Sequence, residues 1–87
     1  MKFDAVILLD SIHDIMAAED SLGENGIDID LIPVPKEIHS NCGMAVGLSK
    51  LNVREAVRLI KIHYRGDMQL FEYKRGTYKR LRLDADV

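Results

Sequence analysis

Short apolar runs alternate along the chain with segments of helical periodicity, and this alternation predicts the order of the secondary structure. Residues 5–9 form a continuous apolar run, which is typical of a strand buried on both faces. Residues 27–32 start with apolar and polar residues in alternation and predict a strand with one wet face at its start. Two further apolar runs, at residues 44–48 and 68–73, predict two more strands, and Gly47 indicates a bulge or a close backbone contact.

The segment after the first run predicts a helix. Ser11 and Asp14 have the spacing of a capping box, and Asn25-Gly26 is typical of a helix end. We expect one stripe at helical spacing to face the core, formed by Ile12, Ile15, Met16 and Leu22.

A second helix is predicted to begin at Asn52. Glu55 stands three residues after this cap, and Leu51 and Ala56 have the positions of a hydrophobic staple. Loss of the Asn52 side chain is expected to cost about 1 kcal/mol. We expect Gly66 to end the helix.

The C-terminal segment predicts a hairpin. Residues 74–76 (Lys-Arg-Gly) have the composition of a turn, and residues 77–83 are expected to return as a short edge strand whose charges discourage further pairing. Residues 84–87 read as a frayed tail.

The predicted order is strand, helix, strand, strand, helix, strand, with a C-terminal β-hairpin extension. This order favours an α+β protein of the ferredoxin-like (βαββαβ) type, a two-layer sandwich in which the first and third strands lie parallel at the centre of the sheet. A small three-layer α/β fold is the alternative. We expect a single domain over residues 1–87, with a core at about 3–75 and a basic hairpin and tail at 74–87.

Composition narrows the class of protein. A chain of 87 residues buries roughly 60% of its unfolded surface, which is enough for one compact core. The net charge of −2 gives no global attraction to nucleic acid or membrane, and no apolar run is long enough to span a bilayer. The start of the chain does not read as a signal sequence, and a single cysteine fits a reducing compartment, so we expect a cytoplasmic protein.

Residues 32–43 hold both prolines and the only cysteine of the chain. The prolines fix their own φ, so the segment is expected to form a stiff loop in which Pro35 starts a short helical turn. Cys42 would then be presented at the exit of the loop, beside Gly43, whose missing Cβ allows positive φ or a close approach to the sulfur. Lys36 and His39 are near enough in sequence to supply positive charge to a thiolate, with His39 and Cys42 sharing one helical face.

Cys42 and His39 also have two alternative roles. A lone cysteine in a small domain is often a buried apolar residue that only packs. His39 and Cys42 have a ligand-like spacing, but a structural zinc site needs four protein ligands, so we expect neither a metal nor a cofactor.

Several segments together resemble the selenium/sulfur carrier protein-like family, a group of short prokaryotic domains. They are Glu19, residues 26–29 (Gly-Ile-Asp-Ile), residues 32–38 (Ile-Pro-Val-Pro-Lys-Glu-Ile) and residues 42–43 (Cys-Gly), within a similarity that covers about residues 3–75. The resemblance implies a carrier, not a stand-alone enzyme, that holds sulfur or selenium on Cys42. It also implies a donor such as a cysteine desulfurase and an acceptor protein. The chain departs from the family at Lys36, where arginine is usual, and at His39 and Asn41, where small or acidic residues are usual.

The alternative function is a non-catalytic ferredoxin-like module that binds a protein, a small ligand or RNA and whose cysteine is structural. The basic residues of the C-terminal hairpin, with tyrosines interleaved, are compatible with RNA binding. We favour the simpler role of a charged edge that prevents aggregation. An exposed edge strand also makes a homodimer a candidate assembly.

Overall fold

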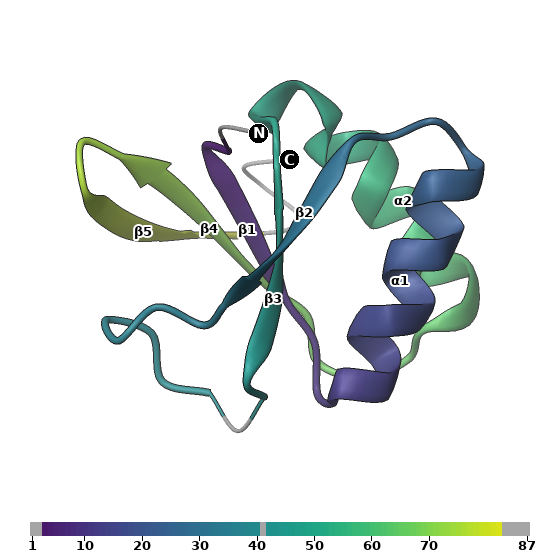
Figure 1. Cartoon of the computed structure of the whole chain (residues 1–87), viewed down its shortest axis with the longest axis horizontal. Helices are drawn as coiled ribbons and strands as arrows, with labels where there is room; N and C mark the ends of the chain where they lie inside the picture. The colour runs from purple at the N-terminus through teal and green to yellow at the C-terminus, as the bar shows by residue number, and fades with distance from the viewer. Residues whose placement is uncertain (1–2, 41, 83–87) are drawn as a thin grey trace.

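Two helices pack on one face of a five-stranded antiparallel sheet in the computed structural model, which describes residues 3–40 and 42–82 (Figure 1). The expected tail at residues 84–87 lies outside the described residues. The elements in chain order are β1 (Ala5–Leu8), α1 (Ile12–Glu24), β2 (Ile29–Pro33), β3 (Met44–Leu48), the 3₁₀ turn η1 (Lys50–Asn52), α2 (Val53–His63), β4 (Gln69–Lys74) and β5 (Thr77–Leu81).

The sheet has the strand order β2-β3-β1-β4-β5, and every neighbouring pair is antiparallel. The α+β class is therefore confirmed, and the three-layer alternative is wrong because both helices cover the same face (Figure 1). The expectation that the first and third strands are parallel is also wrong. The α1 crossover makes β2 run in the direction of β1, and the loop after β2 then reverses the chain, so β3 runs opposite to both.

The central strand β1 is buried on both faces, as its continuous apolar run predicts. Ala5 and Ile7 point into the main core between the sheet and the helices. Val6 and Leu8 point to the opposite, helix-free face, where they belong to a second apolar cluster. The fold therefore has to cover β1 from both sides.

The cap of α1 is confirmed, but its buried stripe differs from the prediction. The Ser11 hydroxyl accepts a hydrogen bond from the Asp14 N–H at 3.2 Å. The buried residues of the helix are Ile15, Ala18 and Leu22. Ile12 and Met16 lie beside this stripe and are 42% and 52% exposed, so the prediction that they face the core is wrong.

The start of α2 also differs from the prediction. Ser49, not Asn52, is the capping side chain: its hydroxyl accepts from the Leu51 N–H at 3.2 Å and opens η1, which leads directly into α2. Asn52 already has helical backbone angles, and its side chain makes no capping hydrogen bond. Leu51 is 94% exposed, so it forms no staple with Ala56.

The hairpin between β4 and β5 is confirmed. Arg75 and Gly76 form its two-residue turn with φ values of 54° and 77°, which is the type I′ geometry that matches the twist of paired strands. Gly47 makes the close contact that was expected, because a Cβ at this position would lie 3.0 Å from the Phe3 ring.

The two candidate caps of the second helix can be compared directly. Ser49→Ala should lower the free energy of unfolding by about 1 kcal/mol, because the Leu51 N–H loses its partner. Asn52→Ala should leave stability nearly unchanged, because Asn52 makes no capping bond and alanine is a better helix former. Urea denaturation of both variants measures the difference, and a larger loss for Asn52→Ala would contradict this assignment.

Candidate functional site

Antiparallel pairing brings three connecting segments to one end of the sheet. This end holds the carboxyl end of β1 and the amino ends of β3 and β4. The residues that follow β1, precede β3 and precede β4 therefore meet here, and Figure 1 shows the loop before β3 and the start of α1 at this end.

The loop between β2 and β3 is held against the helix-free face by two of its apolar side chains, the buried Ile38 and the half-buried Val34. Ile38 is buried and belongs to a cluster with Val6, Leu8 and Ala45. The Ile38 N–H donates to the Pro35 carbonyl at 3.0 Å, and the Val34 N–H donates to the Gly43 carbonyl at 3.1 Å. Pro35 therefore starts a turn, as predicted, but this single turn closes at Ile38 and does not extend to His39.

Cys42 lies immediately before β3 and is only 6% exposed. Its side chain belongs to the main core, on the helix side of the sheet. The thiol donates a hydrogen bond to the Met44 carbonyl at 3.2 Å, and the Cys42 N–H donates to the Ser40 hydroxyl at 3.0 Å. The expectation of a thiol presented to water is therefore wrong in this conformation, because pairing of the adjacent backbone with Val34 turns the side chain inward.

The other predicted site residues make no hydrogen bond to Cys42. Lys36 and His39 are exposed, and the partner of the thiol is the Met44 carbonyl. His39, Ser40 and Cys42 are not helical, so the expected shared helical face of His39 and Cys42 is not formed. Gly43 is exposed and does not have positive φ, which excludes the first of its two expected roles; a Cβ there would meet nothing within 4 Å, so the space for a close approach is open.

A hollow of about 300 Å³ opens beside this loop. His39 and Ser40 line it from the loop, and Asp10, Asp67 and Gln69 line it from the ends of β1 and β4, with Leu8 and Leu9 completing the wall. Sequence reasoning missed Asp10 and Asp67 as site residues. The sequence did contain a signal for them, because each is an acidic residue next to an end of a predicted strand. Only the strand order brings the end of β1 and the start of β4 together.

Tyr64 fixes one side of this hollow. Its hydroxyl accepts from the Asp10 N–H at 2.9 Å and donates to the Asp67 carbonyl at 2.7 Å. The Asp10 carboxylate in turn accepts from the Asp67 N–H at 3.2 Å. Burial of the ring is the main reason that the pKa of Tyr64 rises to about 12. The network joins the segment after β1 to the segment before β4.

Gly66 is required by this network, not by the end of the helix. The helix α2 ends at His63, before this glycine. A Cβ on Gly66 would overlap the Asp10 carboxylate and the Tyr64 hydroxyl. The glycine therefore provides clearance where two segments and a ring converge.

Cys42 is the only cysteine of the chain, so this region holds its only thiol. Within residues 3–40 and 42–82, no group of three or more His, Cys, Asp or Glu side chains is arranged to hold a metal ion. In the same described parts of the chain, neither helix has the length and apolar character needed to cross a bilayer.

The chain matches one known family. Residues 4–66, well over half of the sequence, match the family described as Putative Se/S carrier protein-like. No curated protein and no solved structure matches the chain.

The clearance at Gly66 can be tested by an alanine substitution, and the same substitution at Gly23 is a matched control. Gly66→Ala should lower the free energy of unfolding by about 1–3 kcal/mol, because the new methyl group displaces Tyr64 or Asp10. Gly23→Ala, in a helix with nothing within 4 Å, should raise it by about 0.5–1 kcal/mol. Thermal or urea denaturation separates the two, and equal effects would contradict the clearance role.

The Tyr64 hydroxyl should also make stability depend on pH in the alkaline range. A phenol whose pKa is higher in the folded state stabilises the fold fully below pH 10, and this contribution is lost as pH rises from 10 to 12. Between these values, wild-type stability should fall more steeply than that of Tyr64→Phe. Tyr73→Phe controls for loss of a hydroxyl outside the network, and parallel curves for wild type and Tyr64→Phe would contradict this role.

Proposed function

Because the chain belongs to the Se/S carrier protein-like family, we propose that it carries sulfur or selenium on Cys42 and delivers it to a partner protein. Cys42 is the only cysteine, so it is the only side chain that can form a persulfide. The observation that supports this site most strongly is its place under an exposed segment of backbone. Ser40 and Gly43, close to Cys42 along the chain, are both exposed, and the space around Gly43 is open.

We also infer that β1 to β4 and the two helices follow the ferredoxin-like plan, with β5 as an added edge strand. The order β4-β1-β3-β2, with both helices on one face, supports this inference. In this plan Cys42 stands at the entry of a central strand, where the surrounding sheet holds its backbone in place.

The transfer step exchanges one sulfur–sulfur bond for another and involves no net oxidation. The Cys42 thiol loses its proton to solvent, and its sulfur attacks the terminal sulfur of a persulfide on the donor enzyme. The new bond forms to the Cys42 Sγ as the donor's sulfur–sulfur bond breaks, and the donor leaves as a thiolate. Delivery repeats the exchange: a nucleophile of the acceptor attacks the terminal sulfur and Cys42 leaves. A selenopersulfide follows the same scheme.

Loading of a thiol that is 6% exposed requires the loop to open. The Ile38 side chain is the apolar anchor of this loop, and the Val34–Gly43 and Ser40–Cys42 hydrogen bonds close it. Local opening of such a segment costs less than global unfolding, because few apolar contacts are lost. In the closed state, the same burial shelters the sulfur from solvent oxidants.

We assign partner recognition to the exposed side of this loop. Lys36 and His39 are exposed, and Pro35 is half-buried and shapes the turn between them and β2. Gly43 leaves open space beside the sulfur, which permits a donor cysteine to approach. A cysteine desulfurase as donor and an acceptor protein are the partners that this role requires.

The alternative, a binding module with a structural cysteine, is supported by the same burial of Cys42. The two functions differ in a single measurable respect. A carrier must open its loop and accept sulfur, whereas a structural cysteine stays protected and unmodified.

Sulfur loading tests the proposal directly. Incubation with a cysteine desulfurase and cysteine should add one sulfur atom to the wild-type chain by intact mass, and reduction should remove it. Cys42→Ser should gain nothing, because it has no other thiol. No gain of mass on the wild type, with a desulfurase shown to be active on a known acceptor, would support the structural cysteine instead.

Loop opening has its own test. Ile38→Ala removes the buried anchor and should speed both alkylation of Cys42 by a bulky thiol reagent and sulfur loading by about tenfold or more. Ile62→Ala makes the same chemical change at a residue that is 53% exposed and should leave both rates unchanged. Equal rates for the two variants would show that Ile38 does not control access to the thiol.

A further inference from the structure

The aromatic side chains of the described chain, apart from Tyr64, gather on the helix-free face of the sheet. Tyr73 stands between two rings, with centroid distances of 5.5 Å to Phe3 and 4.8 Å to Tyr78. Phe71 packs with Phe3 and Tyr78 against the second apolar cluster. We call these four residues (Phe3, Phe71, Tyr73 and Tyr78) the aromatic surface. All four are half-buried, so each leaves part of its side chain accessible.

The β2–β3 loop covers only one half of this face. Ile38 covers the part formed by Val6, Leu8 and Ala45, whereas the aromatic surface is built on β4, β5 and Phe3, which lies two residues before β1. Glu37, in the β2–β3 loop, is exposed. Burial of the ring is the main reason that the pKa of Tyr78 is raised, and the charges of Tyr73 and Glu37 add to this shift.

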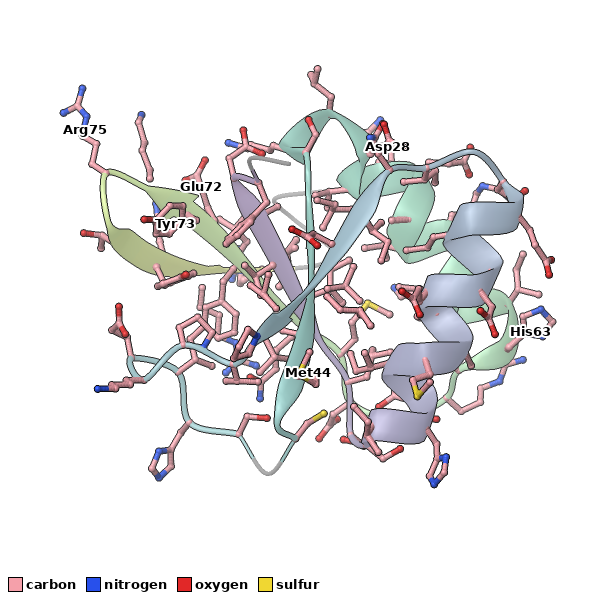
Figure 2. All side chains as sticks on the ribbon, viewed as in Figure 1. Asp28, Met44, His63, Glu72, Tyr73 and Arg75 are labelled. Atoms are coloured by element: carbon pink, nitrogen blue, oxygen red, sulfur yellow. The ribbon has the colours of Figure 1, made fainter. Side chains whose placement is uncertain are left out.

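Cations adjoin the aromatic surface on the hairpin. Arg80 is paired with Phe71 and stands two residues from Tyr78, so strand alternation places it on the same face. Lys74 and Arg75 occupy the tip, and Figure 2 shows the Arg75 side chain extending away from the sheet. Arg75 has φ of 54°, a conformation that residues other than glycine and asparagine adopt with difficulty. An arginine at this position therefore lowers stability somewhat.

The other side of the hairpin holds cations together with a carboxylate. Lys79 is paired with Glu72 on the opposite side of β4 and β5, and the Glu72 carboxylate bonds to Lys50. Lys74 belongs to this same side, because it lies two residues from Glu72 on β4. The positive charge available to the ring side of the hairpin is therefore that of Arg80 and, in the turn, Arg75. It is local, because the whole chain carries a net charge of −2.

We propose that the aromatic surface and its two cations, Arg80 and Arg75, bind single-stranded nucleic acid. Unpaired bases stack on half-exposed rings, and phosphates bind the neighbouring cations. A charged edge that prevents aggregation accounts for the cations but not for the rings, which such an edge does not need. A duplex hides its base faces, and an acidic peptide would use the cations without the rings. This site is separate from Cys42, which packs on the other side of the sheet.

Fluorescence anisotropy with labelled single-stranded oligouridine and oligothymidine tests the proposal on the full chain. Either oligonucleotide should bind, and the affinity should fall with salt with a log–log slope of about −1.4, as two phosphate contacts on a single strand require. Comparison of the affinities for oligouridine and oligothymidine shows whether the surface prefers RNA or DNA. Absence of binding to both at low salt, or equal affinity for a duplex or for polyglutamate, would overturn the proposal.

Matched variants separate stacking from charge. Tyr78→Leu should weaken binding about tenfold while Tyr78→Phe retains it, because the ring and not the hydroxyl stacks on a base. Arg80→Gln should weaken binding and reduce the salt slope by about 0.7, whereas Arg54→Gln, the same change on the exposed side of α2, should alter neither. Glu37→Gln should strengthen binding by removing a negative charge that acts on Tyr78.

Circular dichroism of each variant confirms that it is folded. Equal affinity of Tyr78→Leu and Tyr78→Phe in folded proteins would contradict the stacking role. Cys42→Ser should bind nucleic acid as the wild type does, so failure of sulfur loading and failure of nucleic-acid binding are distinguishable results.

Discussion

The central strand β1 is buried on both faces, and most of the structure follows from the need to cover it twice. Ala5 and Ile7 are covered by the two helices, as expected for an α+β sandwich. Val6 and Leu8 face the side that has no helix, where an antiparallel sheet is often open to solvent. In this protein the β2–β3 loop and a group of aromatic side chains supply the second cover.

This second cover accounts for the conformation of the loop that precedes Cys42. Ile38 draws the loop over the sheet, while the pairing of Val34 with Gly43 extends the β2–β3 ladder and directs Cys42 into the opposite core. The Cys42 thiol therefore lies on the helix side of the sheet, and the loop that precedes it packs on the helix-free side. In the proposed carrier, access to the sulfur would be controlled by the packing of this loop on the sheet.

The two sides of the sheet have different chemistry as a result. The helix side holds the thiol and the Tyr64 network, in which a ring, two aspartates and the clearance at Gly66 fix the segments around the hollow. The helix-free side holds the aromatic surface, with Arg80 and the hairpin tip beside it. The β2–β3 loop takes part in both, since it carries Cys42 into the main core and Ile38 into the cluster on the helix-free side.

The sequence by itself determined the order and type of the elements, the burial of β1, the cap at Ser11 and the β4–β5 hairpin. Each depends on neighbouring residues: apolar runs, a capping side chain, or an Arg-Gly turn with positive φ. It also singled out the segment around Cys42. Only the tertiary structure decided the direction of the thiol, the choice of Ser49 over Asn52 and the exposure of Ile12 and Met16. It also decided that Asp10, Tyr64 and Asp67 lie close together. These features depend on the strand order and on the face of the sheet that each element covers, and long-range packing determines the strand order and the covered faces.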